Sequence, residues 1–123
     1  MGFLWWLPFG RVPEIDAREL RDRLQSGSAP QIIDVRTPAE WRNSRITGAV
    51  NAPVTELKTM LASLTLDQKR PVVAICRSAH RSIPAVRILR AHGFDACQLR
   101  KGMRAWWAAD FPVEGEDQKV GNG

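Results

Sequence analysis

The sequence predicts an α/β fold, in which a doubly wound, mainly parallel five-stranded sheet is flanked by helices. Strand and helix signals alternate along the chain, and this alternation is typical of parallel sheets. Val72–Ile75 is an apolar run of strand length, as expected for a central strand that is covered on both faces. The 123 residues, of which 44% are hydrophobic and 25% charged, suit one globular domain.

The predicted strands are spaced so that a helix or a turn fits after each one. They are Val12–Ile15, Gln31–Val35, a short extended piece within Ile46–Pro53, Val72–Ile75 and Ala96–Leu99. Apolar residues dominate these segments, which indicates that both faces of the sheet are covered.

The first half of the chain carries start and stop signals for two helices. Asp16 caps the first helix, Glu19 follows three residues later as a capping box, and the Ser-Gly-Ser-Ala-Pro segment 26–30 ends it. Thr37 caps a second, short helix with Pro38 at its first position, where the missing N–H of proline costs no hydrogen bond.

Three more helices are expected in the second half. Thr55 opens one whose apolar residues are Leu57, Met60, Leu61 and Leu64. Ser82–His92 forms the next, with Pro84 tolerated in its first turn and Gly93 as its stop. Met103–Ala109 is a last short helix, and its Trp106 is expected in the core.

The two ends of the chain differ in composition from the domain between them. We expect an apolar N-terminal arm (1–11), one domain (12–112) and a flexible polar tail (113–123). The arm contains Phe3, Leu4, Trp5 and Trp6, but it has neither the basic region nor the cleavage site of a signal peptide. Its aromatic residues suit packing on the domain surface, or contact with a protein partner or a membrane surface.

Composition excludes several classes of function. The net charge of +5 favours anionic partners, but the basic residues are scattered and no nucleic-acid-binding motif accompanies them, so we expect no nucleic acid. Two cysteines, far apart, are typical of reduced thiols and predict a cytoplasmic protein, membrane-associated if the arm inserts in a bilayer. The two histidines and two cysteines match no metal-binding spacing.

Cys76 is the candidate nucleophile, because it comes directly after the most apolar strand and shortly before a helix. Ligands of open α/β sheets bind at this carboxyl end of a strand. A short loop there turns its backbone amides inward, and the following helix N-terminus adds partial positive charge. Together with Arg77 and Arg81, this setting favours a thiolate at neutral pH. The alternative is an inert, buried small residue.

The chain resembles the single-domain rhodaneses over roughly residues 12–112. Four motifs occur in the family's order: Ile33–Arg36 with Glu40 and Trp41, then Ile46–Pro53, then Cys76–Ser82, then Gly102–Trp106. The resemblance implies the rhodanese-like fold. It also implies transfer of sulfane sulfur, from a donor such as thiosulfate to cyanide or a thiol, through a Cys76 persulfide. The sulfur transfer that the resemblance implies requires no cofactor.

Loop length separates this chain from the related phosphatases. Those enzymes place five residues between their cysteine and arginine, whereas four residues lie between Cys76 and Arg81. The shorter loop favours a sulfur atom over a tetrahedral phosphate, so a phosphatase or arsenate reductase is the weaker alternative. A non-enzymatic module that binds an anion or a partner is the alternative from another class.

The resemblance assigns the substrate- and persulfide-binding loop to residues that surround the nucleophile: Arg77, Ser78, Ala79, His80, Arg81 and Ser82. We expect Arg77 and His80 to rim the pocket and meet a small sulfur-containing anion, unless they are solvated loop residues. The Ser82 hydroxyl either caps the helix, the preferred prediction, or donates to sulfur. Ala79 stands where the family often has Gly. If this position requires a positive φ, the alanine is strained, because its Cβ disfavours that conformation.

Three charged residues are expected to support the loop from neighbouring elements. Asp34 and Arg36 end the second strand and either face the pocket or pair with each other or with Glu40. Glu40 is also the expected carboxylate partner of Arg81. Cys97 lies in an apolar strand, which favours inert burial over a role as a second thiol.

Overall fold

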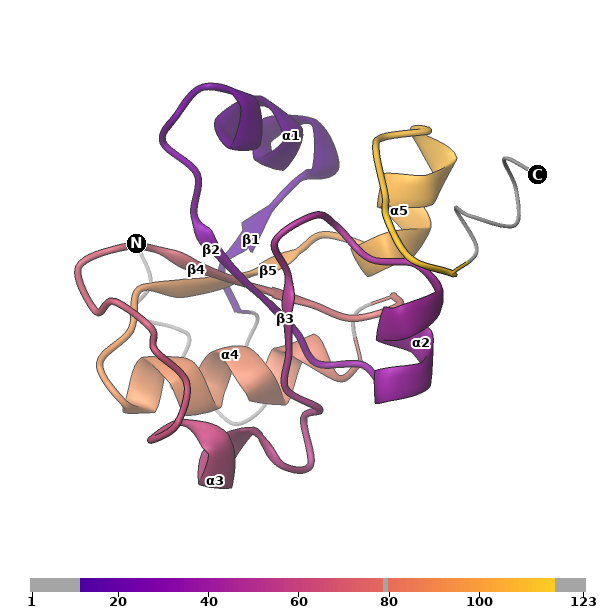
Figure 1. Ribbon diagram of the computed structural model, residues 1–123. Helices are drawn as coiled ribbons and strands as arrows, with labels where there is room; N and C mark the ends of the chain where they lie inside the picture. The colour runs from indigo at the N-terminus through magenta and orange to yellow at the C-terminus, as the bar shows by residue number, and fades with distance from the viewer. Residues whose placement is uncertain (1–11, 79, 117–123) are drawn as a thin grey trace.

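The computed structural model describes residues 12–78 and 80–116 (Figure 1). Three groups of residues lie outside this range: the N-terminal arm with Phe3, Leu4, Trp5 and Trp6, then Ala79 in the Cys76 loop, and residues 117–123. The expectations for these residues therefore remain predictions.

The described residues form an α/β fold whose sheet is parallel throughout, which confirms the predicted class. The strands are β1 (Glu14–Ile15), β2 (Gln31–Asp34), β3 (Val50–Asn51), β4 (Val72–Ile75) and β5 (Ala96–Leu99). Their order across the sheet is β1-β5-β4-β2-β3, and every neighbouring pair is parallel. All carboxyl ends therefore lie along one edge of the sheet, where Asp34 is in register with Ile75 and Asn51.

Helices cover both faces of this sheet, which makes the fold doubly wound. They are α1 (Ala17–Gln25), α2 (Pro38–Asn43), α3 (Leu57–Met60), α4 (Ser82–Ala91) and α5 (Gly102–Ala108). Figure 1 shows α1 and α5 over one face and α3 and α4 over the other, with α2 beside the carboxyl ends of β2 and β3.

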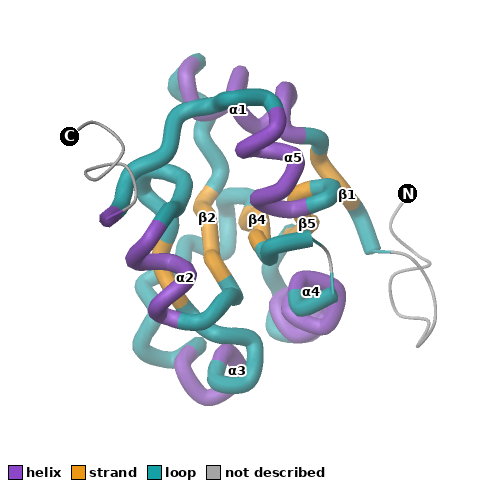
Figure 2. The backbone as a smooth tube through the Cα atoms, turned by 90° about the vertical axis from the view of Figure 1, so that its right-hand side faces the viewer, coloured by secondary structure: helices purple, strands orange, loops and turns teal. Residues whose placement is uncertain are grey.

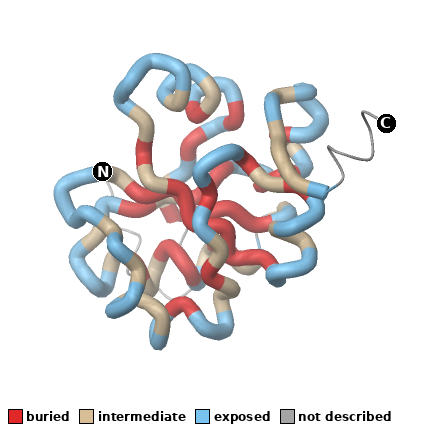
Figure 3. Tube along the Cα trace, viewed as in Figure 1, coloured by how far each residue is buried: buried red, intermediate tan, exposed pale blue. Residues whose placement is uncertain are grey.

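The core consists of two layers, one on each side of the central strands. Side chains alternate along β4, so Val73 and Ile75 pack with α1 and α5, whereas Val72 and Ala74 pack with α4. Buried residues run continuously through the middle of the molecule in Figure 3. Trp106 is 1% exposed and donates its indole N–H to the Pro112 carbonyl at 2.8 Å, which confirms its expected core position.

The first two helices begin at the predicted caps. The Asp16 carboxylate accepts the amide of Glu19 at 2.8 Å, but the Glu19 side chain bonds Arg23 rather than completing a capping box. Thr37 and Glu40 form the full box at α2, because each side chain accepts the other residue's backbone N–H.

Two elements are shorter than expected. α3 covers Leu57–Met60 rather than a segment from Thr55 to Leu64, and no side chain caps its first turn. After Met60 the chain turns, since the amides of Ser63 and Leu64 both donate to the Met60 carbonyl, and Leu64 still packs on the core. β1 begins at Glu14, because the preceding Pro13 has no N–H to donate.

The segment predicted as a flexible tail begins with a contact to the domain. Glu114 forms an isolated antiparallel bridge with Arg45, in which each amide donates to the other's carbonyl at 2.9 Å. The Arg45 Nε–Glu114 Oε2 distance of 3.1 Å adds an ion pair. A long-range partner of this kind is invisible in the local composition that suggested a tail.

Candidate active site

Cys76 follows β4 directly and lies in the core rather than at the surface. It continues the alternation of the strand, so its side chain belongs to the layer between the sheet and α4 and is 1% exposed. The amide N–H of Arg81 donates to Cys76 Sγ at 3.4 Å. A backbone donor aimed at buried sulfur stabilises negative charge there.

The helix that follows the Cys76 loop begins at a different residue from the predicted cap. Arg81 occupies the cap position, and Ser82 is the first residue of α4. The predicted Ser82 cap is therefore wrong. Its hydroxyl instead donates to Gln98 Oε1 at 2.6 Å, because Ser82 is fully buried against β5.

Helix α5 holds the same loop from the other side of the sheet. The amides of Met103 and Arg104 donate to the carbonyls of Cys76 and Arg77 at 2.8 and 3.0 Å. Two carbonyls of the loop therefore point away from the sulfur toward α5, and Figure 2 shows the loop between α5 and α4. This contact removes acceptor oxygens from the surroundings of Sγ, where they would repel an anion.

Gly102 makes this close approach feasible. Its φ is +55°, and a Cβ added there would lie 2.3 Å from the Cys76 carbonyl oxygen. Lys101 before it also has a positive φ of 60°, so two successive left-handed residues turn the chain from β5 into α5. Gly102 belongs to the fourth motif of the family resemblance, and its role was not predicted from the sequence; the available signal was a glycine between a strand and a helix.

Glu40 braces the far end of the loop from α2. Its carboxylate accepts hydrogen bonds from both Nη atoms of Arg81, at 2.7 and 3.2 Å, as expected from the sequence. The hydrogen bond from Arg81 is the main cause that lowers the pKa of Glu40 to about 2. The same hydrogen bond raises the pKa of Arg81, so the pair is ionised across the physiological range.

Asp34 and Arg36 pair with each other. Arg36 Nη2 lies 2.7 Å from Asp34 Oδ2 and also donates to the Ser44 carbonyl at 2.7 Å, and both side chains are buried. Asn51 Nδ2 donates to the carbonyls of Asp34 and Arg36 at 3.0 Å. This buried cluster holds together the carboxyl ends of β2 and β3, beside the Cys76 loop.

The remaining loop residues form its outer surface. Arg77 and His80 are exposed and Ser78 is half-buried. Cys97 is mostly buried in β5, and burial is the main cause that raises its pKa to about 11, which keeps this thiol protonated at neutral pH. Of the two thiols, only Cys76 receives a backbone N–H from the described part of the loop.

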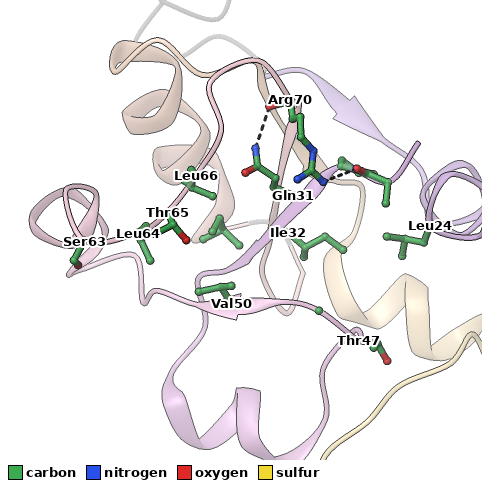
Figure 4. Close-up of a pocket in the computed structure, with 14 residues that line it drawn as sticks. Leu24, Gln31, Ile32, Thr47, Val50, Ser63, Leu64, Thr65, Leu66 and Arg70 are labelled. Carbon is green, nitrogen blue, oxygen red and sulfur yellow. Dashed lines mark hydrogen bonds between the residues drawn. The ribbon is translucent and has the colours of Figure 1, made fainter. Parts of the chain in front are cut away.

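Two cavities lie at different distances from this loop. One of about 540 Å³ touches it at Ser78 and His80 and continues along Arg100, Lys101 and Arg104. Another, of about 460 Å³, is lined by Leu24, Ile32, Val50 and Leu64; Figure 4 shows it beside Gln31, which bonds the Arg70 carbonyl. Gln31 begins β2 and Arg70 precedes β4, so this second cavity lies at the end of the sheet opposite Cys76.

The described residues contain no transmembrane or metal-binding feature. None of the helices between residues 12 and 116 has the length and apolar character needed to span a bilayer. In the same residues, no three His, Cys, Asp or Glu side chains are arranged to hold a metal ion.

Comparison with known proteins identifies the family. The rhodanese-like domain family matches residues 16–109, so the chain belongs to the rhodanese-like domain family. Among solved structures, the rhodanese-like domain of an Anabaena protein is 31% identical, with a TM-score of 0.78 over 86% of this chain and 81% of that one. A rhodanese-like domain protein of Staphylococcus aureus is 30% identical, with a TM-score of 0.75 over 85% and 99%.

Curated relatives differ in length. A sulfurtransferase of Allochromatium vinosum is 33% identical over 83% of this chain and 94% of its own. An HTH-type transcriptional regulator of Mycobacterium tuberculosis is 40% identical over 89% of this chain, and the probable adenylyltransferase/sulfurtransferase MoeZ of that species is 39% identical over 75%. The matched segment spans 47% of the regulator and 24% of MoeZ.

Proposed function

We propose that the chain is a sulfurtransferase that carries sulfane sulfur on Cys76. The observation that supports this most is the buried Cys76 sulfur at the end of β4, which receives the Arg81 amide at 3.4 Å. Similarity to a sulfurtransferase that this chain matches over 94% of its length supports the reaction class. The four-residue loop between Cys76 and Arg81 supports sulfur over phosphate as the group transferred.

The reaction proceeds in two displacements. The Cys76 thiolate attacks the outer sulfur of a donor such as thiosulfate, so an S–S bond forms to Cys76 while sulfite leaves with the electron pair of the broken S–S bond. A thiophilic acceptor, cyanide or a thiolate, then attacks the outer sulfur of the persulfide. The acceptor leaves with that sulfur, as thiocyanate or as a new persulfide, and Cys76 is released as a thiolate.

Each part of the site has a role in this scheme. The Arg81 amide stabilises the anionic sulfur, as a donor in an oxyanion hole does. Arg77 and His80 at the rim attract the donor dianion, and the Glu40–Arg81 pair keeps the loop closed. Ser78, Ala79 and Ser82 complete the loop, Asp34 and Arg36 support it, and the scheme uses neither metal nor cofactor.

Replacement of the nucleophile tests this proposal. Cys76→Ser should abolish thiosulfate:cyanide transfer, and mass spectrometry after thiosulfate treatment should show the mass of one added sulfur in the wild type but not in Cys76→Ser. Cys97→Ser is the matched control and should keep both properties, because Cys97 is held as an unreactive thiol. Full transfer by Cys76→Ser would refute the proposal.

A second candidate function is a binding module, and the similarity to an HTH-type regulator favours it. In such a module Cys76 would accept sulfur without turning over. Single-turnover loading that cyanide does not reverse would favour this alternative. Steady hydrolysis of an aryl phosphate would instead favour the phosphatase alternative named in the comparison of loop lengths.

A further inference from the structure

Gln98 is a buried amide within a strand whose other residues are apolar. It is 4% exposed, and its neighbours in β5 are Ala96, Cys97 and Leu99. A polar side chain in a core costs free energy unless its donors and acceptors are satisfied. A leucine or a methionine would fill a similar volume without that cost. The contacts of the Gln98 amide therefore indicate what this position contributes.

The Gln98 amide joins the edge strand β1 to the start of α4. Its Oε1 accepts the Ser82 hydroxyl at 2.6 Å, and its Nε2 donates to Glu14 Oε2 at 2.8 Å. Glu14 is also the register partner of Gln98 in the parallel pair of β1 and β5. A carboxylate only accepts, so the amide turns its NH₂ toward Glu14 and its oxygen toward Ser82. We call Glu14, Gln98 and Ser82 the Gln98 bridge.

One end of the Gln98 bridge reaches the residue that follows the sulfur's hydrogen-bond donor. Ser82 is fully buried as the first residue of α4, and it comes directly after Arg81, whose amide donates to Cys76 Sγ at 3.4 Å. The cap residue Arg81 forms no side-chain cap bond, so contacts such as the one from Gln98 hold the start of α4. Ala74, two residues before Cys76, pairs with Gln98 across the sheet. The bridge therefore fixes the start of α4 relative to the strand that carries the sulfur.

We propose that Gln98 is a positioning residue for sulfur transfer, because its amide bridges Glu14 and Ser82 and thereby holds the Arg81 amide against the Cys76 sulfur. The inference rests on the proposed function and adds to it a residue that lies outside the Cys76 loop. Gln98 acts through its neighbours and not on the sulfur itself. Its donor end needs the acceptor at Glu14, so the direction of the amide matters as well as its size.

Gln98→Glu tests the donor end of the amide at constant shape. Below its pKa the new carboxyl group is neutral, so it donates to Glu14 and accepts from Ser82 as the amide does. Burial and the neighbouring Glu14 raise the pKa of this carboxyl above its ordinary value of about 4.3. Above that pKa, two carboxylates face each other without a proton between them. Arg100, whose Nε lies 3.6 Å from Glu14 Oε1, offsets only part of this repulsion.

The measurement is the single-turnover rate at which thiosulfate loads sulfur on Cys76, relative to wild type at the same pH. For Gln98→Glu this ratio should lie within about twofold of one at pH 5.5 and at least about tenfold lower at pH 8, because the displaced Arg81 amide no longer stabilises the anionic sulfur. Gln98→Met keeps the volume but neither bond, so it should lose about tenfold at both pH values. A Gln98→Met rate equal to that of the wild type would overturn the inference.

A charge swap distinguishes the bridge from a general packing role. In the double variant Glu14→Gln, Gln98→Glu, the amide introduced at position 14 donates to the ionised carboxylate at position 98, which still accepts from Ser82. Loading at pH 8 should therefore return to within about threefold of wild type, and no recovery would contradict the bridge.

The matched control is Gln31→Glu at the opposite end of the sheet. Both ends of the Gln31 amide are also bonded, to backbone groups that precede β4. The same replacement there should leave the loading ratio near one at both pH values, because it is remote from Cys76. A fall at pH 8 as large as that of Gln98→Glu would refute a specific role of Gln98.

The backbone amide NMR signal of Arg81 separates this inference from the proposed function. It should move in Gln98→Met, and in Gln98→Glu at pH 8, and return toward its wild-type position in the charge swap, while urea denaturation shows that each variant is folded. If thiosulfate never loads Cys76 in the wild type, the sulfurtransferase proposal fails, and the Arg81 signal still decides whether Gln98 positions this amide. If loading occurs but neither rate nor signal depends on Gln98, only the inference fails.

Discussion

At the scale of single residues, the site depends on Gly102 as much as on its charged groups. A Cβ at this position would meet the Cys76 carbonyl oxygen at 2.3 Å and the Arg77 carbonyl at 2.8 Å. Both contacts are to backbone atoms, which have no rotamer to move aside. Any other residue must therefore push α5 away from the loop and lengthen the bonds from Met103 and Arg104.

Gly102→Ala should lower the free energy of unfolding by about 3 kcal/mol, from steric overlap added to backbone strain. Sulfur transfer should fall at least about tenfold, because the displaced loop no longer aims the Arg81 amide at Sγ. Gly27→Ala is the control: its φ of +88° carries similar strain, but no atom lies within 4 Å of the added Cβ. Urea denaturation and single-turnover kinetics check both variants, and equal losses would contradict the role of the close approach.

At the scale of elements, α2 and the start of α4 are joined by the Glu40–Arg81 pair. Glu40 also completes the capping box with Thr37, so one side chain both starts α2 and anchors the loop. Its pKa falls from 4.5 to about 2 on folding, because the ionised carboxylate is bonded by Arg81. The stabilisation is complete above pH 4.5 and is lost as the pH falls toward 2.

Glu40→Gln keeps the capping acceptor and removes the charge. Relative to wild type it should cost about 1 kcal/mol of unfolding free energy at pH 7, since the pair is partly exposed. The difference should shrink toward zero between about pH 4.5 and 2, as the wild-type carboxylate is protonated. Urea titrations at pH 7, 4 and 3 measure it; a difference that is independent of pH would exclude an electrostatic brace.

At the scale of the whole molecule, a buried ion pair holds together the edge of the sheet where Cys76 lies. The Arg36 side chain donates to the Asp34 carboxylate at the end of β2 and to the Ser44 carbonyl after α2. The Asn51 side chain in β3 donates to the backbone carbonyls of Asp34 and Arg36. The cluster connects the end of β2 with β3 and with the residue that follows α2. Its loss is therefore expected to lower the stability of the whole domain.

Arg36→Met should cost about 3–5 kcal/mol, because it leaves the Asp34 carboxylate buried without a cation. The double variant Asp34→Leu, Arg36→Met should be more stable than Arg36→Met alone, since no buried charge remains. Arg45→Met removes the half-exposed pair with Glu114 and should cost only about 1 kcal/mol. Denaturant midpoints rank the three variants, and a double variant as unstable as the single one would contradict this explanation.

Local signals in the sequence were enough to predict much of the fold. The apolar β4, the Thr37 cap with Pro38, and the helix that ends before Gly93 each depend on residues close together in the chain. Contacts with residues distant in sequence were not predicted. Glu114 pairs with Arg45, and Ser82 bonds Gln98 rather than capping α4.

By itself, the sequence determined that a cysteine follows a buried strand, that four residues separate it from Arg81, and that a helix comes next. These features are local, so propensity, periodicity and capping chemistry specify them. Only the tertiary structure decided that the amides of Met103 and Arg104 in α5 bind the carbonyls of Cys76 and Arg77, and that Lys101 and Arg104 line the same cavity as Ser78 and His80. The two carbonyl contacts each join residues 27 positions apart in sequence, and they form only when the sheet brings the ends of β4 and β5 together.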